Sequence, residues 1–146
     1  MPQVLKVQSP PEDEWVGFAL ALQMYLETLE EGEFLCVSLK NRPHYFVQFA
    51  EQGANGVRIE ATSNYYIPEC DSLTAAQHKN LIELGWRWPT NLPERREFGG
   101  HKPEGSPNYF LDLDRTVSLE SISALAVSTL RNVFGANHPH DLEYDP

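Results

Sequence analysis

The side chains best suited to chemistry lie near the end of the sequence, where histidines and carboxylates are clustered. His138, His140, Asp141 and Glu143 are all residue types that can bind divalent metals. A specific metal site requires further ligands at a fixed spacing, and the sequence contains no second pair of that kind. We therefore expect these side chains to be structural or solvated, and we predict neither a metal nor a cofactor.

A catalytic function would have to use the long polar stretch at 87–106, which contains His101 within GGHKPEG. His101 could act as a base, but no serine or cysteine lies in a recognisable nucleophile motif. The surrounding glycines lack the lysine and hydroxyl residue of a phosphate-binding loop. Asp112 and Asp114 have a spacing that paired carboxylates could use, but a solvated strand face accounts for them better. We therefore predict a protein that is not an enzyme, with a small enzyme built around the 87–106 loop as a less favoured alternative.

The composition indicates one globular domain with an acidic surface. The 146 residues are 41% hydrophobic, which favours a single domain over 1–146 with a packed core. Eleven Lys and Arg against 21 Asp and Glu give a net charge of −10. This charge argues against nucleic acid and anionic membranes as partners and favours a basic protein surface. Because neither a signal peptide nor a membrane-spanning run is recognised, we expect a cytoplasmic protein in which Cys36 and Cys70 are reduced.

The first predicted helix carries more apolar surface than one buried face requires. Ser9 and Glu12 form a capping-box pattern, and Gly32 marks the end of the helix. Apolar residues recur every three or four positions on one face, and a second apolar set lies beside them. The first set includes Trp15, Phe18, Leu22, either Tyr25 or Leu26, and Leu29, and the second is Val16, Leu20 and Met24. We expect the extra surface to contact a partner.

Three strands follow this helix, separated by turn residues. They are expected at 34–39, 45–49 and 57–62, where strand-forming residues predominate. The third strand alternates apolar and polar residues, which predicts that one face of the sheet is exposed to water.

The second half of the chain is predicted to contain two more helices and two short strands. Thr74 and Gln77 form a capping box for a helix that ends at Gly85. Short strands are expected at 86–88 and 108–113, on either side of the long loop. The last helix is expected from about 119 to 134 with Ser118 as its cap, and 137–146 is an acidic tail.

These elements predict an α+β fold. Their order is helix, three strands, helix, two strands, helix. In such a fold the three helices pack on an antiparallel sheet of about five strands.

Three phrases of the sequence resemble a known group of proteins. LTAAQHKNLIELGWRWP at 73–89, PNYFLDLD at 107–114 and TLRNVFGANHPHDLEY at 129–144 resemble the YbjN and TY-Chap group. The order of elements is similar to that of the bacterial type III secretion chaperones. In those chaperones the domain pairs into a dimer and holds an extended segment of a client protein against its sheet and helices. The resemblance implies the same fold, a polypeptide partner and a homodimer.

We predict from this resemblance a bacterial, chaperone-like protein that binds another polypeptide. Binding would bury apolar side chains of the client and pair its backbone along an exposed sheet edge. For the two tryptophans, packing within the sheet or core is the alternative to partner contact. The residues expected to contact the partner are Trp15, Phe18, Leu22, Trp86, Trp88, Tyr109 and Phe110.

A different class of function is also consistent with the acidic composition. An acidic regulatory or immunity-type inhibitor would use its negative surface to block a basic protein target. Such binding should weaken steeply as ionic strength rises, whereas apolar client binding should persist.

Overall fold

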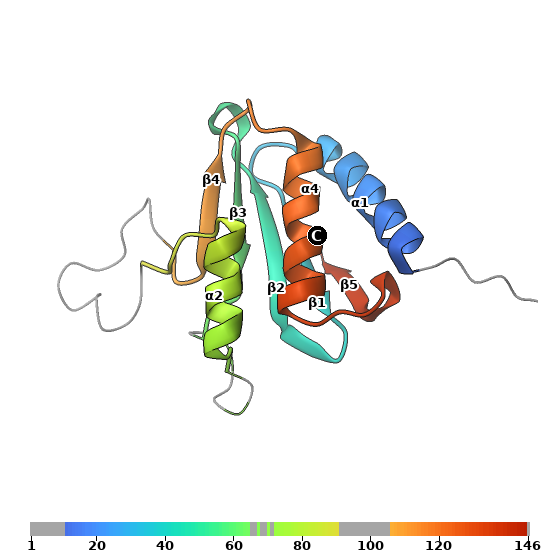
Figure 1. Ribbon diagram of the computed structural model, residues 1–146. Coiled ribbons are helices and arrows are strands. Elements are labelled where there is room, and N and C mark those ends of the chain that lie inside the picture. The colour runs from blue at the N-terminus through green and yellow to red at the C-terminus, as the bar shows by residue number, and fades with distance from the viewer. Residues whose placement is uncertain (1–10, 65–66, 68–69, 71, 91–105, 146) are drawn as a thin grey trace, which may run out of the picture.

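The structure is a computed structural model that describes residues 11–64, 67, 70, 72–90 and 106–145 (Figure 1). The predicted cap at Ser9 lies outside the described residues, as does His101 with its surrounding glycines. Within the described chain, no helix is both long enough and apolar enough to cross a membrane.

Five antiparallel strands form one sheet in the order β4-β3-β2-β1-β5. Buried and less buried side chains alternate along β1, β2 and β3, so one face of the sheet carries the core and the other is partly exposed. The strands are β1 (Phe34–Leu39), β2 (Arg42–Glu51), β3 (Val57–Ala61), β4 (Tyr109–Leu113) and β5 (Leu142–Asp145).

Three helices pack against the buried face of the sheet. They are α1 (Pro11–Thr28), α2 (Ala75–Leu84) and α4 (Leu119–Ser128), and α4 continues into a π-helical turn, η3 (Thr129–Val133). Figure 1 shows α2 on the β4 side of the sheet, and α1 beside α4 at the other side. Leu22 of α1, Phe49 of β2 and Leu130 of η3 are all fully buried in one core.

The sequence signals for helix ends in the second half of the chain are confirmed. The Thr74 hydroxyl accepts a hydrogen bond from the Gln77 N–H, and the Gln77 side chain accepts one from the Thr74 N–H. Gly85 adopts a left-handed conformation with φ 107°, which ends α2. The Ser118 hydroxyl accepts a hydrogen bond of 3.1 Å from the Ser121 N–H at the start of α4.

The α+β class with three helices and a five-stranded antiparallel sheet is confirmed, but the fifth strand comes from a different segment than expected. The segment 86–88 makes one bridge, in which Arg87 and Phe110 exchange hydrogen bonds of 3.1 and 3.2 Å. Pro89 has no N–H for the next bond of that ladder, so the pairing stops there. The segment 142–145, expected as part of an acidic tail, follows the last helix as β5.

The two cysteines are free thiols, as predicted. Burial, together with the nearby Asp145 carboxylate, raises the pKa of Cys36 to about 11. The Cys36 thiol therefore stays protonated near neutral pH and is a weak nucleophile.

Candidate functional site

Six of the seven residues expected to contact a partner are buried within the chain itself. Only Trp88 keeps most of its ring exposed, at 56%. The buried six are Trp15, Phe18, Leu22, Trp86, Tyr109 and Phe110. These six side chains are not open surface in the structure, because neighbouring elements cover the inward stripe of α1 and the residues of β4 and the segment before it, and their contact with a partner stays a prediction. Contact between Trp88 and a partner stays a prediction.

Trp86 and Tyr109 are held by polar contacts to neighbouring helices. The Trp86 indole N–H donates a hydrogen bond of 2.9 Å to the Thr129 hydroxyl of η3. The Tyr109 hydroxyl is hydrogen-bonded to Nδ1 of His78 on α2. Burial raises the pKa of Tyr109 to about 12 and lowers the pKa of His78. Trp88 covers this pair, with its ring centroid 6.0 Å from that of His78 and 5.5 Å from that of Tyr109.

Phe110 lies on the other face of the sheet, between two guanidinium groups. Arg58 and Arg87 each stack on its ring, with 5.1 Å from guanidinium carbon to ring centroid. Arg58 is in turn bonded to both carboxylate oxygens of Asp112 at 2.8 Å. Asp114 accepts hydrogen bonds from the backbone and hydroxyl of Thr116. The two aspartates therefore have separate structural partners and do not form a catalytic pair.

The clustered residues near the end of the chain also have structural roles. The His138 side chain accepts a hydrogen bond of 3.0 Å from the His140 N–H, and the Asp141 carboxylate accepts one of 3.1 Å from the His138 N–H. These bonds cap the short 3₁₀ turn η4 (Pro139–Asp141), which leads into β5. Within the described residues, no group of three or more His, Cys, Asp or Glu could hold a metal ion.

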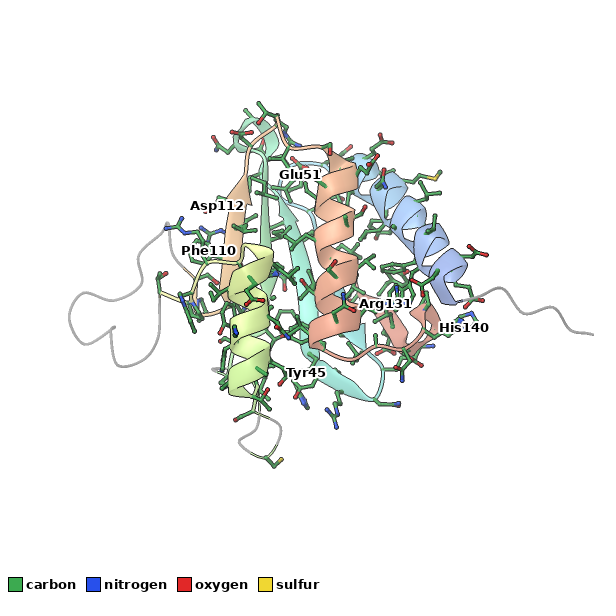
Figure 2. All side chains as sticks on the ribbon, viewed as in Figure 1. Tyr45, Glu51, Phe110, Asp112, Arg131 and His140 are labelled. Carbon is green, nitrogen blue, oxygen red and sulfur yellow. The ribbon has the colours of Figure 1, made fainter. Side chains whose placement is uncertain are left out.

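A hollow of about 390 Å³ lies between α1 and the β5 edge of the sheet. Phe18 and Tyr144 face each other there, with ring centroids 6.0 Å apart. The Glu14 carboxylate contacts Nε2 of His138 at its margin. The hollow is lined by Glu14, Phe18, Lys40, His138, Pro139, His140, Leu142 and Tyr144, and we call it the α1–β5 groove. In Figure 2 the labelled His140 lies near the N-terminal end of α1, across the molecule from Phe110 and Asp112.

The outer edge of β5 presents free backbone groups next to this groove. The Lys40 N–H donates to the Asp141 carbonyl at 2.8 Å, and the register continues to Ser38↔Glu143 and Cys36↔Asp145. Because hydrogen-bonded and non-bonded pairs alternate in an antiparallel ladder, the N–H and C=O groups of Leu142 and Tyr144 point away from β1. The Leu142 N–H donates to the Pro139 carbonyl of η4, so the open groups are the Leu142 C=O and the N–H and C=O of Tyr144. Among the described strands, none pairs with this side of β5. At the opposite edge of the sheet, Arg87 already bridges β4.

The outer face of α1 is a second exposed apolar surface. Val16, Leu20 and Met24 are 60%, 55% and 69% exposed. The sequence identified these residues as an extra apolar set beside the main stripe. The structure confirms that this set stays outside while the main stripe packs inward.

Two other hollows lie at the ends of the helices and contain groups with structural partners. In the hollow between α1 and α4, Arg115 forms an ion pair with the buried Glu51. The Arg115 guanidinium also donates a hydrogen bond of 2.9 Å to the Gly53 carbonyl. The other lies beside Phe134 and Asp141, and the Asp141 carboxylate there caps η4.

The described elements define a class of small α+β protein in which helices cover one sheet face and a short edge strand keeps free backbone groups. Residues 8–146 match the family model described as T3SS (YopN, CesT) and YbjN peptide-binding chaperone 3, or TY-Chap3. The chain belongs to this family, so the predicted membership of the YbjN and TY-Chap group is confirmed. No curated protein and no solved structure matches the chain.

Proposed function

We propose that this protein binds an extended segment of another polypeptide along the outer edge of β5. The observation that carries the proposal is the outward C=O of Leu142 and the outward N–H and C=O of Tyr144, which lie beside an apolar groove. The description of the family as peptide-binding supports a polypeptide ligand and names no reaction. Binding of this kind needs neither a cofactor nor a catalytic group.

The incoming segment adds as a sixth strand next to β5. Its backbone takes up the hydrogen bonds that the Leu142 C=O and the Tyr144 N–H and C=O offer, as in other complexes in which a peptide extends a sheet. Alternate side chains of the segment point to the helix-covered face, where the α1–β5 groove lies. The volume of about 390 Å³ falls within the range of about 300–1,000 Å³ that is usual for ligand pockets. Apolar side chains gain about 0.8 kcal/mol for each CH₂ that they bury there.

A proline substitution tests the role of the β5 backbone. Tyr144→Pro removes an N–H that points toward the incoming strand and leaves the pairing with β1 intact, because residue 144 lies at a non-bonded position of that ladder. We expect peptides selected from a random display library to lose at least about tenfold in affinity, as judged by fluorescence anisotropy.

Two matched variants control this test. Tyr144→Ala separates loss of the ring from loss of the N–H and should weaken binding less than Tyr144→Pro. Glu143→Pro removes an N–H that faces β1, so it should lower the stability of β5 itself, which thermal unfolding would detect. Unchanged peptide affinity in Tyr144→Pro would exclude this edge as the binding site.

The resemblance to secretion chaperones also supports a cytoplasmic location in a bacterium and a homodimer. Cell fractionation of the native host tests the location. Sedimentation velocity of the purified chain tests the homodimer, for which a mass of about twice 16.6 kDa is expected.

A further inference from the structure

A straight row of exposed side chains follows the outer face of α1. Asp13, Val16, Leu20, Met24 and Glu27 are separated by three or four residues, so they lie on one helix face. All five are exposed, and the row is turned away from the core that Leu22 and Leu26 enter. We call these five residues the α1 ridge.

The α1 ridge is apolar in its centre and acidic at both ends. No Lys or Arg occurs between residues 11 and 39, so α1 supplies no cation of its own. Glu12 is bound by Arg131 at 3.0 Å, and Glu14 is paired with His138. In the part of the chain that the structure describes, no ion pair includes Asp13 or Glu27. These two carboxylates remain available to a cationic partner.

The shape of the ridge favours a helix as the partner. The backbone N–H and C=O groups in the middle of α1 are used within the helix, so the ridge offers side chains only. A partner that docks there must satisfy its own backbone, and a helix does so. Gly17 lies beside the ridge, and a Cβ at this position would meet no atom within 4 Å. The absence of a side chain at Gly17 and the methyl group of Ala21 allow a second helix to approach α1 closely.

A second copy of this chain is a poor occupant of the ridge. In an antiparallel pair centred on Leu20, Val16 would face Met24, but Asp13 of each copy would face Glu27 of the other. In a parallel pair each carboxylate would face its own equivalent. Both arrangements place like charges together at both ends of a small contact, which disfavours association.

We propose that the α1 ridge binds a basic amphipathic helix of a partner protein. The apolar side chains of that helix cover Val16, Leu20 and Met24, and a Lys or Arg at each end pairs with Asp13 and Glu27. This surface is separate from the β5 edge, so the inference does not depend on strand addition. A contact of one helix pair is much smaller than the roughly 800 Å² per partner of a standard interface, so we expect weak, salt-dependent binding.

The proposal can be tested with a designed helical peptide and the full chain. The probe is an alanine-based helix with three leucines flanked by lysines at the spacing of the ridge, and its matched control has glutamates in place of the lysines. We expect amide chemical shifts to change along α1 when the lysine peptide is added. The acidic peptide should bind at least about tenfold more weakly.

Matched substitutions locate the contact. Leu20→Gln should weaken binding of the lysine peptide about tenfold, whereas Ala124→Gln, at an exposed position of α4, should leave it unchanged. Glu27→Lys should weaken it severalfold more than Glu83→Lys, which makes the same change of charge on α2. Tyr144→Pro should leave it unchanged, which distinguishes this surface from the β5 edge.

Three results would overturn the proposal. Equal affinity of the lysine and glutamate peptides would show that Asp13 and Glu27 do not attract a cationic partner. Equal affinity of the wild type and Leu20→Gln would place the peptide elsewhere. A dimer that Leu20→Gln dissociates in sedimentation velocity would show that a second copy occupies the ridge.

Discussion

Trp86 and Trp88 are two residues apart and face the same side of the chain, yet their surroundings differ. Trp86 is buried and donates to Thr129 on η3, whereas Trp88 stacks on His78 and stays exposed. A spacing of two predicts that both rings share a side, which the structure confirms. Which ring is buried depends on α2 and η3, and a spacing cannot show where those elements lie.

His78 predicts a pH dependence of stability. Burial lowers the pKa of His78 below its ordinary value of 6.5, so the folded chain binds fewer protons than the unfolded chain between these two pKa values. The contribution of neutral His78 to stability is therefore complete above pH 6.5 and is lost as the pH falls through this window.

The variant His78→Asn isolates this effect, because asparagine keeps a polar atom near the Tyr109 hydroxyl and does not titrate. We expect the difference in unfolding free energy between wild type and variant to shrink between about pH 7.5 and pH 5, as measured by urea unfolding. A difference that stays constant over this range would contradict the role of His78.

At the scale of elements, a glycine within a helix and a glycine that ends a helix should respond oppositely to substitution by alanine. Gly17 lies within α1, where a Cβ has open space, so Gly17→Ala should raise the unfolding free energy by about 0.5–1 kcal/mol. Gly85 has φ 107° at the end of α2, so Gly85→Ala should lower it by about 1 kcal/mol or more. Urea unfolding measures both, and changes of the same sign would contradict these backbone assignments.

The elements that local patterns specify could be predicted, and those that depend on distant pairing could not. The caps at Thr74 and Ser118 and the end at Gly85 follow from neighbouring residues, and the structure contains all three. Strand β5 has only Leu142 buried and pairs with β1, which lies far away in the sequence. No local pattern encodes that pairing, so the segment was expected as a tail.

The candidate site, too, depends on contacts between distant segments that local sequence patterns do not encode. Periodicity separated two apolar sets on α1, one containing Phe18 and one containing Leu20, but both are apolar enough to bind a partner. The packing of α1 against α4 and the sheet decides that Phe18 is buried and Leu20 exposed. The α1–β5 groove also requires β5, so the sequence could not reveal it.

At the scale of the whole molecule, the charge of −10 allows a test against the inhibitor alternative. Pairing along β5 relies on backbone hydrogen bonds and apolar contacts, which salt screens little. We expect a display-selected peptide that binds β5 to keep its affinity between about 0.05 and 0.5 M NaCl. A steep loss over this range would favour an acidic inhibitor that acts through its charge.

The most direct test of the central claim is hydrogen exchange at single backbone amides, with and without a display-selected peptide. The proposed strand addition predicts slower exchange at the N–H of Tyr144, which points away from β1, whereas the Leu142 N–H is already bonded to the Pro139 carbonyl. Protection confined to other segments, with unchanged exchange at the Tyr144 amide, would contradict the claim that β5 is the binding edge.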